Sequence, residues 1–219
     1  IGLPADRRPL SHRDDQSPFW AEVTLKPITI SGVTKVMAGV RNIDEKKKAD
    51  EQIKYQNDFE KLILDISNKF INIPYIEVDK EIEASIKKIC HFTNTDAGQI
   101  FLHDDINNTT NLHYCWLKKT VNYGKKQQIE DEVNQWYLEK MRKGESIIVE
   151  TLDDIPEDQV DLRSRVSDQG INSLAEIPLF YQNSFIGSFS IAVSKPGRKW
   201  LPYEVSLLKL TGQIFVNVI

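Results

Sequence analysis

The sequence predicts an α+β fold, in which a central, mainly antiparallel sheet carries helices on both faces. Two observations lead to this prediction. From residue 44 onward, the order of segments is helix, helix, strand, strand, helix, strand, helix, strand, strand, helix. Successive strands are joined by short polar turns such as NNTT and QNS, and strands joined so tightly pair antiparallel. The helices are then left to cover the two faces of that sheet.

The composition is that of a soluble globular protein. Its 219 residues are 40% hydrophobic and 27% charged, with a formal net charge of -4. This balance argues against nucleic-acid and anionic-membrane partners, which need a clustered basic face. Since the chain has neither an apolar run of about 18 residues nor a signal peptide, we expect a cytoplasmic protein with no membrane partner. A first residue Ile1, in place of methionine, indicates that the sequence starts inside a longer one.

Residues 17–43 predict an antiparallel hairpin. In FWAEVTLKPI, apolar and polar residues alternate, so that Ala21, Val23 and Leu25 share one face of a strand. The turn signal Ser31-Gly32 separates this strand from a second one that ends near residue 43. Because an isolated hairpin is only marginally stable in water, we expect it to dock on another structure or to belong to a larger sheet.

Residues 44–71 form a helical pattern without internal Gly or Pro. Ala49, Gln56 and Ile63 recur at intervals of seven, and so do Phe59 and Ile66. Such a heptad spacing is typical of a dimer seam between parallel helices. The alternative is that residues 59–71 pack into the core of their own chain behind a solvated lead-in. The sequence leaves both interpretations open.

The remaining elements follow in order. A second helix places Ile82, Ile86 and Ile89 on one face, and the strands AGQIFLHD and NLHYCWLKK follow it. EDEVNQWYLEKMRKGE predicts a helix that ends at Gly144, and SIIVE predicts a strand. The acidic stretch up to Gly170 predicts a short helix. A hairpin is expected in NSLAEIPLFYQNSFIGSFSIAVS.

The last helix, residues 202–219, has no stop signal after it. Leu208, Thr211 and Phe215 repeat at 3–4 spacing and extend the possible dimer seam. We expect Trp200, just before this helix, to pack it onto the sheet. Arg198 and Lys199 are expected to stay in solvent.

The hairpin and its exit resemble a known family. DDQSPFWAEVTLKPI followed by VMAGVRNIDEKKKADEQI is similar to the last two strands of a PAS domain and the helix that leaves it. The resemblance implies that residues 1–44 are the C-terminal remnant of a PAS domain and residues 45–58 a linker helix. The part of a PAS domain that forms the ligand cleft is missing from this sequence, so we expect no PAS ligand.

Residues 59–219 resemble a GAF domain. The similarity is strongest in NTDAGQIFLHDD, in INSLAEIPLFYQNSFIGS and in GRKWLPYEVSLLKLTGQIFVNVI. Bacterial sensor proteins of the histidine kinase, diguanylate cyclase and phosphodiesterase types carry such modules. The positions that match the family pattern are Gly170, Ile171, Ser173, Leu174, Pro178, Leu179, Ile186, Gly187, Arg198, Trp200, Glu204, Leu207, Leu208, Gly212, Ile214, Phe215 and Asn217.

The resemblance also bears on ligands. Covalent bilin attachment needs a cysteine on the ligand side, and residues 130–170 contain none. The cyclic-nucleotide signature NKxnFx3DE is only partly matched, since Ser194 replaces Asn and Glu204-Val205 replaces Asp-Glu. A noncovalent small molecule stays open, and five residues are candidates to line its pocket. They are Tyr114, Trp116, Trp136, Tyr137 and Glu176. The alternative is that the aromatic side chains simply fill the core.

No enzyme motif is evident. Cys115 lies two residues from His113, so both side chains are expected on one strand face, but no oxyanion glycine motif or partner acid accompanies them. The chain has no phosphate-binding GxxxxGK[ST] loop. Cys90 and Cys115 lack CxxC spacing, and the histidines lack HExxH spacing, so we expect no metal site.

These observations predict a non-catalytic sensory module. We expect a homodimer that relays a ligand or an upstream signal to a downstream kinase or cyclic-di-GMP output domain on the same chain. The alternatives are a small-molecule or cyclic-nucleotide receptor and, less favoured, a redox enzyme.

Overall fold

A computed structural model describes residues 19–119, 128–130 and 135–219. The chain divides into two compact units, Ile1–Asn57 and Asp58–Ile219. One helix, α1 (Asp44–Phe70), begins in the first unit and ends in the second. None of the helices in the described ranges is long and apolar enough to cross a membrane.

The first unit contains the predicted hairpin. Strands β1 (Ala21–Ile30) and β2 (Val33–Asn42) pair antiparallel along their whole length. Ser31 and Gly32 both have positive φ, at 50° and 80°, which is the geometry of a two-residue hairpin turn that follows the twist of the strands. At the open end, the Asp44 carboxylate accepts a hydrogen bond from the Trp20 backbone N–H, with an N···Oδ1 distance of 2.6 Å.

One face of this hairpin is apolar and exposed. Val23 lies opposite Val40, Leu25 opposite Ala38, and Pro27 opposite Val36. Leu25 and Val36 keep 60% and 67% of their surface exposed. The other face carries charged residues, among them Glu22, Lys26, Lys35 and Arg41. The alternation read from the sequence is therefore confirmed, and within residues 19–57 no element covers this apolar side.

The second unit is built on a six-stranded, fully antiparallel sheet with the order β5-β4-β3-β8-β7-β6. The strands are β3 (Ala97–Asp104), β4 (Thr109–Leu117), β5 (Gln128–Glu130), β6 (Ile147–Val149), β7 (Ser173–Tyr181) and β8 (Ser184–Val193). The strand predicted at SIIVE corresponds to β6. The predicted sheet is thus confirmed, with β5 as an additional short edge strand.

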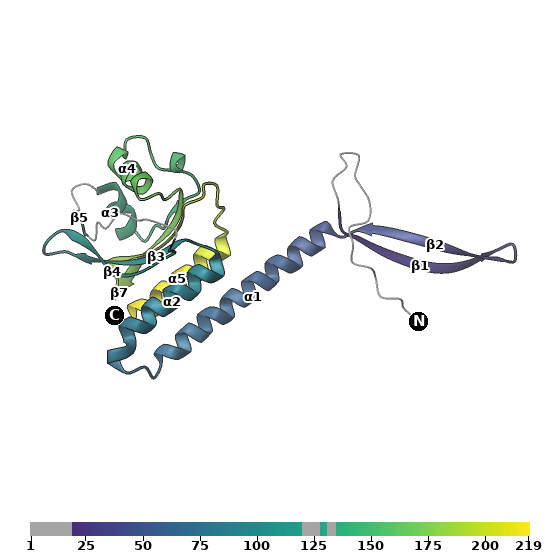
Figure 1. The fold of residues 1–219 in the computed structure, drawn as a ribbon, viewed down its shortest axis with the longest axis horizontal. Helices are drawn as coiled ribbons and strands as arrows, with labels where there is room; N and C mark the ends of the chain where they lie inside the picture. Colours follow the sequence, from purple (N-terminus) through teal and green to yellow (C-terminus); the bar gives the residue numbers. More distant parts are fainter. Residues whose placement is uncertain (1–18, 120–127, 131–134) are drawn as a thin grey trace. The chain divides into compact units, whose positions relative to one another are not determined.

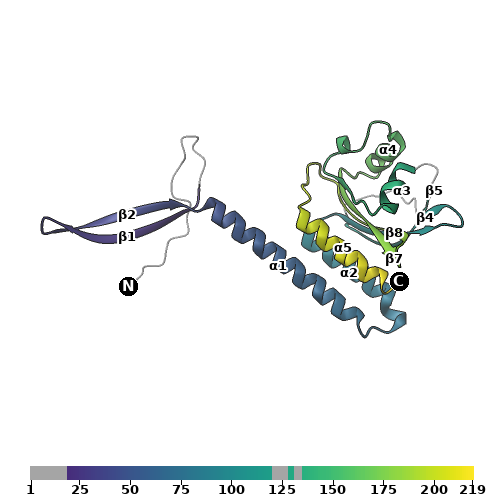
Figure 2. The ribbon, with the colours of Figure 1, turned by 180° about the vertical axis from the view of Figure 1, so that it is seen from behind.

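Helices cover both faces of this sheet (Figures 1 and 2). The second half of α1 lies beside α2 (Val78–Thr93) and α5 (Pro202–Val216) on one face, which we call the three-helix face. The shorter helices α3 (Gln135–Arg142) and α4 (Val160–Asp168) lie on the other, the α3 face. Short 3-10 turns, η1 (Tyr75–Glu77) and η3 (Leu152–Asp154), complete the connections.

Two glycines allow the helices to approach the sheet closely. A Cβ on Gly98 of β3 would lie 2.5 Å from the Ile86 Cγ2 atom and 2.6 Å from the Cys90 sulfur of α2. A Cβ on Gly212 of α5 would lie 2.7 Å from Leu179 of β7. Close packing of this kind leaves no room for a methyl group, so α2 and α5 are held against their strands.

Apolar side chains are buried on both faces of the sheet, and the aromatic part of the core lies on the three-helix face. Phe59 of α1 stacks on Phe92 of α2 with ring centroids 5.1 Å apart. Phe215 of α5 makes edge contacts with Phe70 of α1 at 6.3 Å and with Phe189 of β8 at 5.4 Å. These aromatic contacts join both ends of the second unit to its sheet.

The side chains assigned to a dimer seam lie in this core. Six of the eight are buried within their own chain, namely Phe59, Ile63, Ile66, Leu208, Thr211 and Phe215. Ala49 is exposed and Gln56 is half-buried, both in the first half of α1. The alternative interpretation of residues 59–71, a helix packed into its own core, is therefore the observed one. A contact between two copies would use Ala49, Gln56 or other positions of these helices that are not buried.

Candidate functional site

The α3 face of the sheet carries a compact polar cluster. The Tyr137 hydroxyl of α3 lies 2.6 Å from Glu176 Oε1 of β7 and 2.9 Å from Ser188 Oγ of β8. The Ser188 hydroxyl lies 2.7 Å from the same Glu176 oxygen. Tyr137 is 8% exposed and Ser188 is completely buried. The carboxylate of the half-buried Glu176 is thus held by two hydroxyl groups, both of which belong to buried residues.

This cluster lies within apolar surroundings. Glu176 lies on the same face of β7 as Leu174, which belongs to an apolar cluster with Tyr137, Met141 and Ile147. A carboxylate placed among such residues is costly unless hydrogen bonds satisfy it. The Tyr137 and Ser188 hydroxyls meet that need, and they fix the position of a hydrogen-bond acceptor under α3.

The five predicted pocket residues are separated by the sheet. Tyr137 and Glu176 come together, and the half-buried Trp136 packs against the same apolar cluster. Tyr114 and Trp116 lie on the three-helix face, where the Tyr114 hydroxyl donates a 2.7 Å hydrogen bond to Asp79 of α2. The Trp116 ring makes an edge contact at 5.0 Å with His91 of the same helix.

The position of Tyr114 and Trp116 follows from strand pairing. Trp116 lies opposite Gly98 and Tyr114 opposite Ile100 on β3, and Gly98 is the point at which α2 meets the sheet. Residues that pair directly share a face. Burial, followed by the nearby Asp79 carboxylate, raises the pKa of Tyr114 to about 12.

The thiols are poorly suited to nucleophilic chemistry. Burial raises the pKa of Cys90 to about 12, and burial also raises the pKa of Cys115. The thiolate is the reactive form, so both groups are mostly unreactive near pH 7. His113 is exposed and its ring lies next to Tyr114, at 6.3 Å. Within the described ranges, no three His, Cys, Asp or Glu residues gather in a way that could hold a metal ion.

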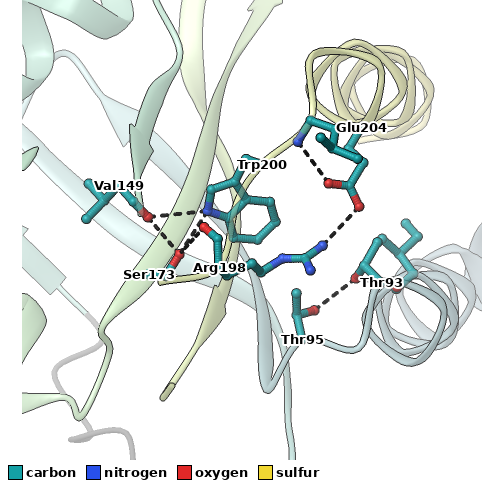
Figure 3. Close-up of polar contacts among 9 residues, drawn as sticks. Thr93, Thr95, Val149, Ser173, Arg198, Trp200 and Glu204 are labelled. Carbon is teal, nitrogen blue, oxygen red and sulfur yellow. Dashed lines mark hydrogen bonds and ion pairs between the residues drawn. The ribbon is translucent and has the colours of Figure 1, made fainter. Parts of the chain in front are cut away.

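A second cluster attaches α5 to the end of the sheet (Figure 3). The Trp200 indole N–H points to Ser173 Oγ of β7 at 3.0 Å and to the Val149 carbonyl of β6 at 3.3 Å. The Arg198 guanidinium lies over the Trp200 ring, 4.3 Å from its centroid. The predicted role of Trp200 in packing the last helix onto the sheet is therefore consistent with its contacts.

Arg198 is not a solvated residue, contrary to the expectation from the sequence. Its Nη2 atom donates to Glu204 Oε1 of α5 at 3.0 Å, and only 22% of its side chain is exposed. The other carboxylate oxygen of Glu204 accepts the Leu201 backbone N–H at 3.1 Å. Glu204 is 3% exposed, so this ion pair is largely desolvated. A pairing across six residues at a loop-helix junction has no periodic sequence signal, which is why the sequence did not reveal it.

Asp96 connects three strand ends near this cluster. Its Oδ1 atom accepts a 3.0 Å hydrogen bond from Lys118 Nζ, and its Oδ2 atom accepts from Ser194 through the backbone N–H at 3.0 Å and the hydroxyl at 2.8 Å. Burial alone would raise the pKa of Asp96, but the hydrogen bonds from Ser194 and Lys118 outweigh it and lower the pKa below its ordinary value.

Comparison with known proteins identifies the scaffold. The sequence profile described as GAF domain matches residues 77–219. No curated protein matches the chain. The phycocyanobilin-bound GAF domain from a cyanobacterial phytochrome is similar in structure, with a TM-score of 0.62 and 12% identity, over 73% of this chain and 92% of that one.

Two further solved structures give the same result. The phycoerythrobilin-bound GAF domain from a cyanobacterial phytochrome has a TM-score of 0.60 and 12% identity, over 73% of this chain and 93% of that one. The blue-light absorbing form of the Thermosynechococcus elongatus PixJ GAF domain has a TM-score of 0.55 and 12% identity, over 68% and 89%. At these identities the likeness concerns the fold.

Replacing Glu204 with Gln should destabilise the second unit by about 3 kcal/mol, because Arg198 then keeps its charge without a counter-charge in a largely buried position. Urea unfolding followed by circular dichroism measures the change. The matched control is Glu145→Gln, which breaks an exposed pair with Lys140 and should alter stability little. Equal effects of the two substitutions would contradict a special role for Glu204.

Asp96 should make the second unit sensitive to acid. A carboxyl group whose pKa is lowered by folding stabilises the protein above its unfolded pKa, near 4, and loses that contribution as pH falls through the lower folded value. The stability difference between the natural protein and Asp96→Asn should therefore narrow as pH falls below about 4. Urea unfolding at a series of pH values tests this, with the exposed Asp168→Asn as control. A difference that stays constant with pH would refute it.

Proposed function

The chain belongs to the GAF domain family, and we propose that it is a sensory module, without catalytic activity of its own, that relays a signal through its terminal helices. The main support is that the two faces of the sheet carry different structures. The α3 face holds a satisfied polar cluster under short helices, whereas the three-helix face holds the long helices α1, α2 and α5.

A short physical path joins the two faces. Ser188 belongs to the polar cluster, and the next residue of β8, Phe189, packs edge-on against Phe215 of α5. Consecutive residues of a strand point to opposite faces, so a shift of β8 at Ser188 must also move the ring at Phe189. Phe215 in turn contacts Phe70 of α1, which brings both terminal helices of the unit into the path.

We further propose that residues 1–44 are the end of a PAS domain and that residues 45–58 link it to the GAF domain. The exposed apolar face of the β1–β2 hairpin supports this, because a face with Leu25 at 60% and Val36 at 67% exposure is expected to pack against further structure. In this scheme an upstream signal enters through α1, and a kinase or cyclic-di-GMP output domain on the same chain receives it after α5.

Dimerisation is the second part of the proposal. Since the heptad positions in the second half of α1 are buried in its own core, a second copy would contact positions that stay exposed on the same helices. These include Leu64 of α1 at 63% and Leu210 of α5 at 58%. Exposed apolar side chains on long helices are a common basis for association between helices.

A receptor for a noncovalent small molecule is the second candidate function. Tyr137, Glu176 and Ser188 support it, because they present fixed polar groups on the face of the sheet that α3 covers. The bound bilins are a property of the similar phytochrome domains, not an observation on this chain. In this chain the raised pKa values of Cys90 and Cys115 argue against a thioether bond and against the redox-enzyme alternative.

Light scattering on the purified chain tests the dimer. We expect the mass of two copies, and we expect Leu64→Glu with Leu210→Glu to shift the equilibrium toward monomer, because buried charges at a helix contact are costly. The matched control is Ile106→Glu, which changes an equally apolar residue at 91% exposure in the β3–β4 loop. A strict monomer at high concentration would disprove the dimer.

Native mass spectrometry of the freshly purified chain, and of the chain incubated with biliverdin or cyclic GMP, tests the receptor. We expect a noncovalent adduct that disappears on denaturation and is weakened by Tyr137→Phe, which removes one hydroxyl from the polar cluster. Tyr114→Phe is the matched control, since it removes a hydroxyl on the opposite face. Absence of any adduct would leave the chain as a relay without a small-molecule ligand.

A further inference from the structure

A solvent-open hollow lies at one end of the sheet, away from the Tyr137 cluster. It forms where β3 begins and where β4 and β8 end, and its volume is about 260 Å³. That is slightly below the roughly 300–1,000 Å³ of pockets that bury drug-sized molecules, so it fits a smaller ligand. The residues that matter for its chemistry are Asn94, Asp96, Lys118, Lys195, Gly197 and Arg198.

Positive charge exceeds negative charge in the lining of this hollow. Lys118, Lys195 and Arg198 contribute three cations, against the single carboxylate of Asp96. Both oxygens of that carboxylate are already engaged, one by Lys118 and the other by Ser194. The exposed Lys195 has no ion-pair partner among the described residues.

Arg198 adds a donor that the protein leaves unused. Its Nη2 atom binds Glu204, whereas its Nε atom is buried and has no hydrogen-bond partner in the described structure. Buried donors are normally satisfied, so an unpaired one needs an explanation. The Trp200 ring under the guanidinium holds the group in place, so the charge that lines the hollow is already ordered.

The loop between β8 and α5 is held in position around the hollow. The Gly197 backbone N–H donates to the Glu150 carbonyl at 2.9 Å, and the Asn172 side-chain amide donates to the Ser194 carbonyl at 2.6 Å. Lys195 and Arg198 therefore extend from a loop that is tied to the sheet at both ends. A ligand that binds to an already ordered loop causes a smaller loss of conformational entropy.

We propose that this hollow binds the phosphate group of a small soluble molecule, or free phosphate, between Lys195 and Arg198. Guanidinium and ammonium groups are the usual partners of phosphate oxygens, the first as a planar donor set and the second as a point charge. Lys118 stays with Asp96 and contributes to the local positive potential. The site is separate from the α3 face, and it does not depend on a ligand there.

The site also has a direct connection to α5. Arg198 binds the first turn of that helix through Glu204, so an anion that pairs with the guanidinium charge acts on the anchor of α5. Phosphate at this position would therefore bias the helix that leads out of the domain. This makes the hollow a second input, next to the polar cluster on the other side of the sheet.

Isothermal titration calorimetry at constant ionic strength, with inorganic phosphate and with glucose 6-phosphate, tests the proposal. We expect saturable binding of one molecule per chain, and about tenfold weaker binding in Lys195→Gln, because one charged contact is lost. Lys199→Gln is the matched control, since Lys199 lies in the same loop, is exposed and does not line the hollow. Glucose without phosphate should not bind.

The outcomes separate clearly. Tighter binding of glucose 6-phosphate identifies a phosphorylated metabolite as the ligand, and tighter binding of inorganic phosphate identifies the free anion. The proposal is overturned if neither compound gives saturable heat, or if Lys195→Gln and Lys199→Gln weaken binding equally. Circular dichroism of both variants confirms that each retains the fold. Loss of a ligand on the α3 face would leave this result unchanged, so the two sites fail independently.

Discussion

The buried carboxylate of Glu204 is the constraint on which the C-terminal part of the domain depends. Such a group is tolerated only when charged and polar partners replace the water it has lost. Arg198 and the Leu201 N–H supply those partners, and the Trp200 ring supports Arg198 from below. Trp200 in turn is hydrogen-bonded to β6 and β7. The contacts that satisfy the Glu204 carboxylate therefore connect α5, the loop before it and the edge of the sheet.

The two faces of the sheet differ in how they are packed. Gly98 and Gly212 let α2 and α5 lie close to the strands, which gives the three-helix face a dense aromatic core around Phe215. The α3 face is covered by shorter helices and holds Glu176 among apolar side chains. The two environments meet on adjacent residues of one strand, because Ser188 of β8 belongs to the polar cluster and Phe189 to the aromatic core.

Much of this architecture could be predicted from the sequence, because period and turn chemistry are local signals. The alternation in FWAEVTLKPI gave the hairpin, and the short turns gave an antiparallel sheet. The face of the sheet on which a given side chain lies could not be predicted as well. Alternation shows that Tyr114 and Trp116 lie on one face of β4. That this is the three-helix face follows from the pairing of Trp116 with Gly98, where α2 packs on the sheet. The Arg198–Glu204 pair was missed because it bridges a loop and a helix.

The heptad spacing of α1 shows how one pattern can serve two structures. Phe59 and Ile66 recur at seven residues, as a dimer seam requires, yet they are fully buried against α2 and the sheet of the same chain. An apolar stripe repeats at nearly the same spacing whether its partner is another copy or the helix's own domain. Association between copies would therefore use exposed positions of α1 and α5, such as Ala49 in the first half of α1 or Leu64 and Leu210. A helix anchored inside by the core and contacted outside by a partner can pass movement from one to the other.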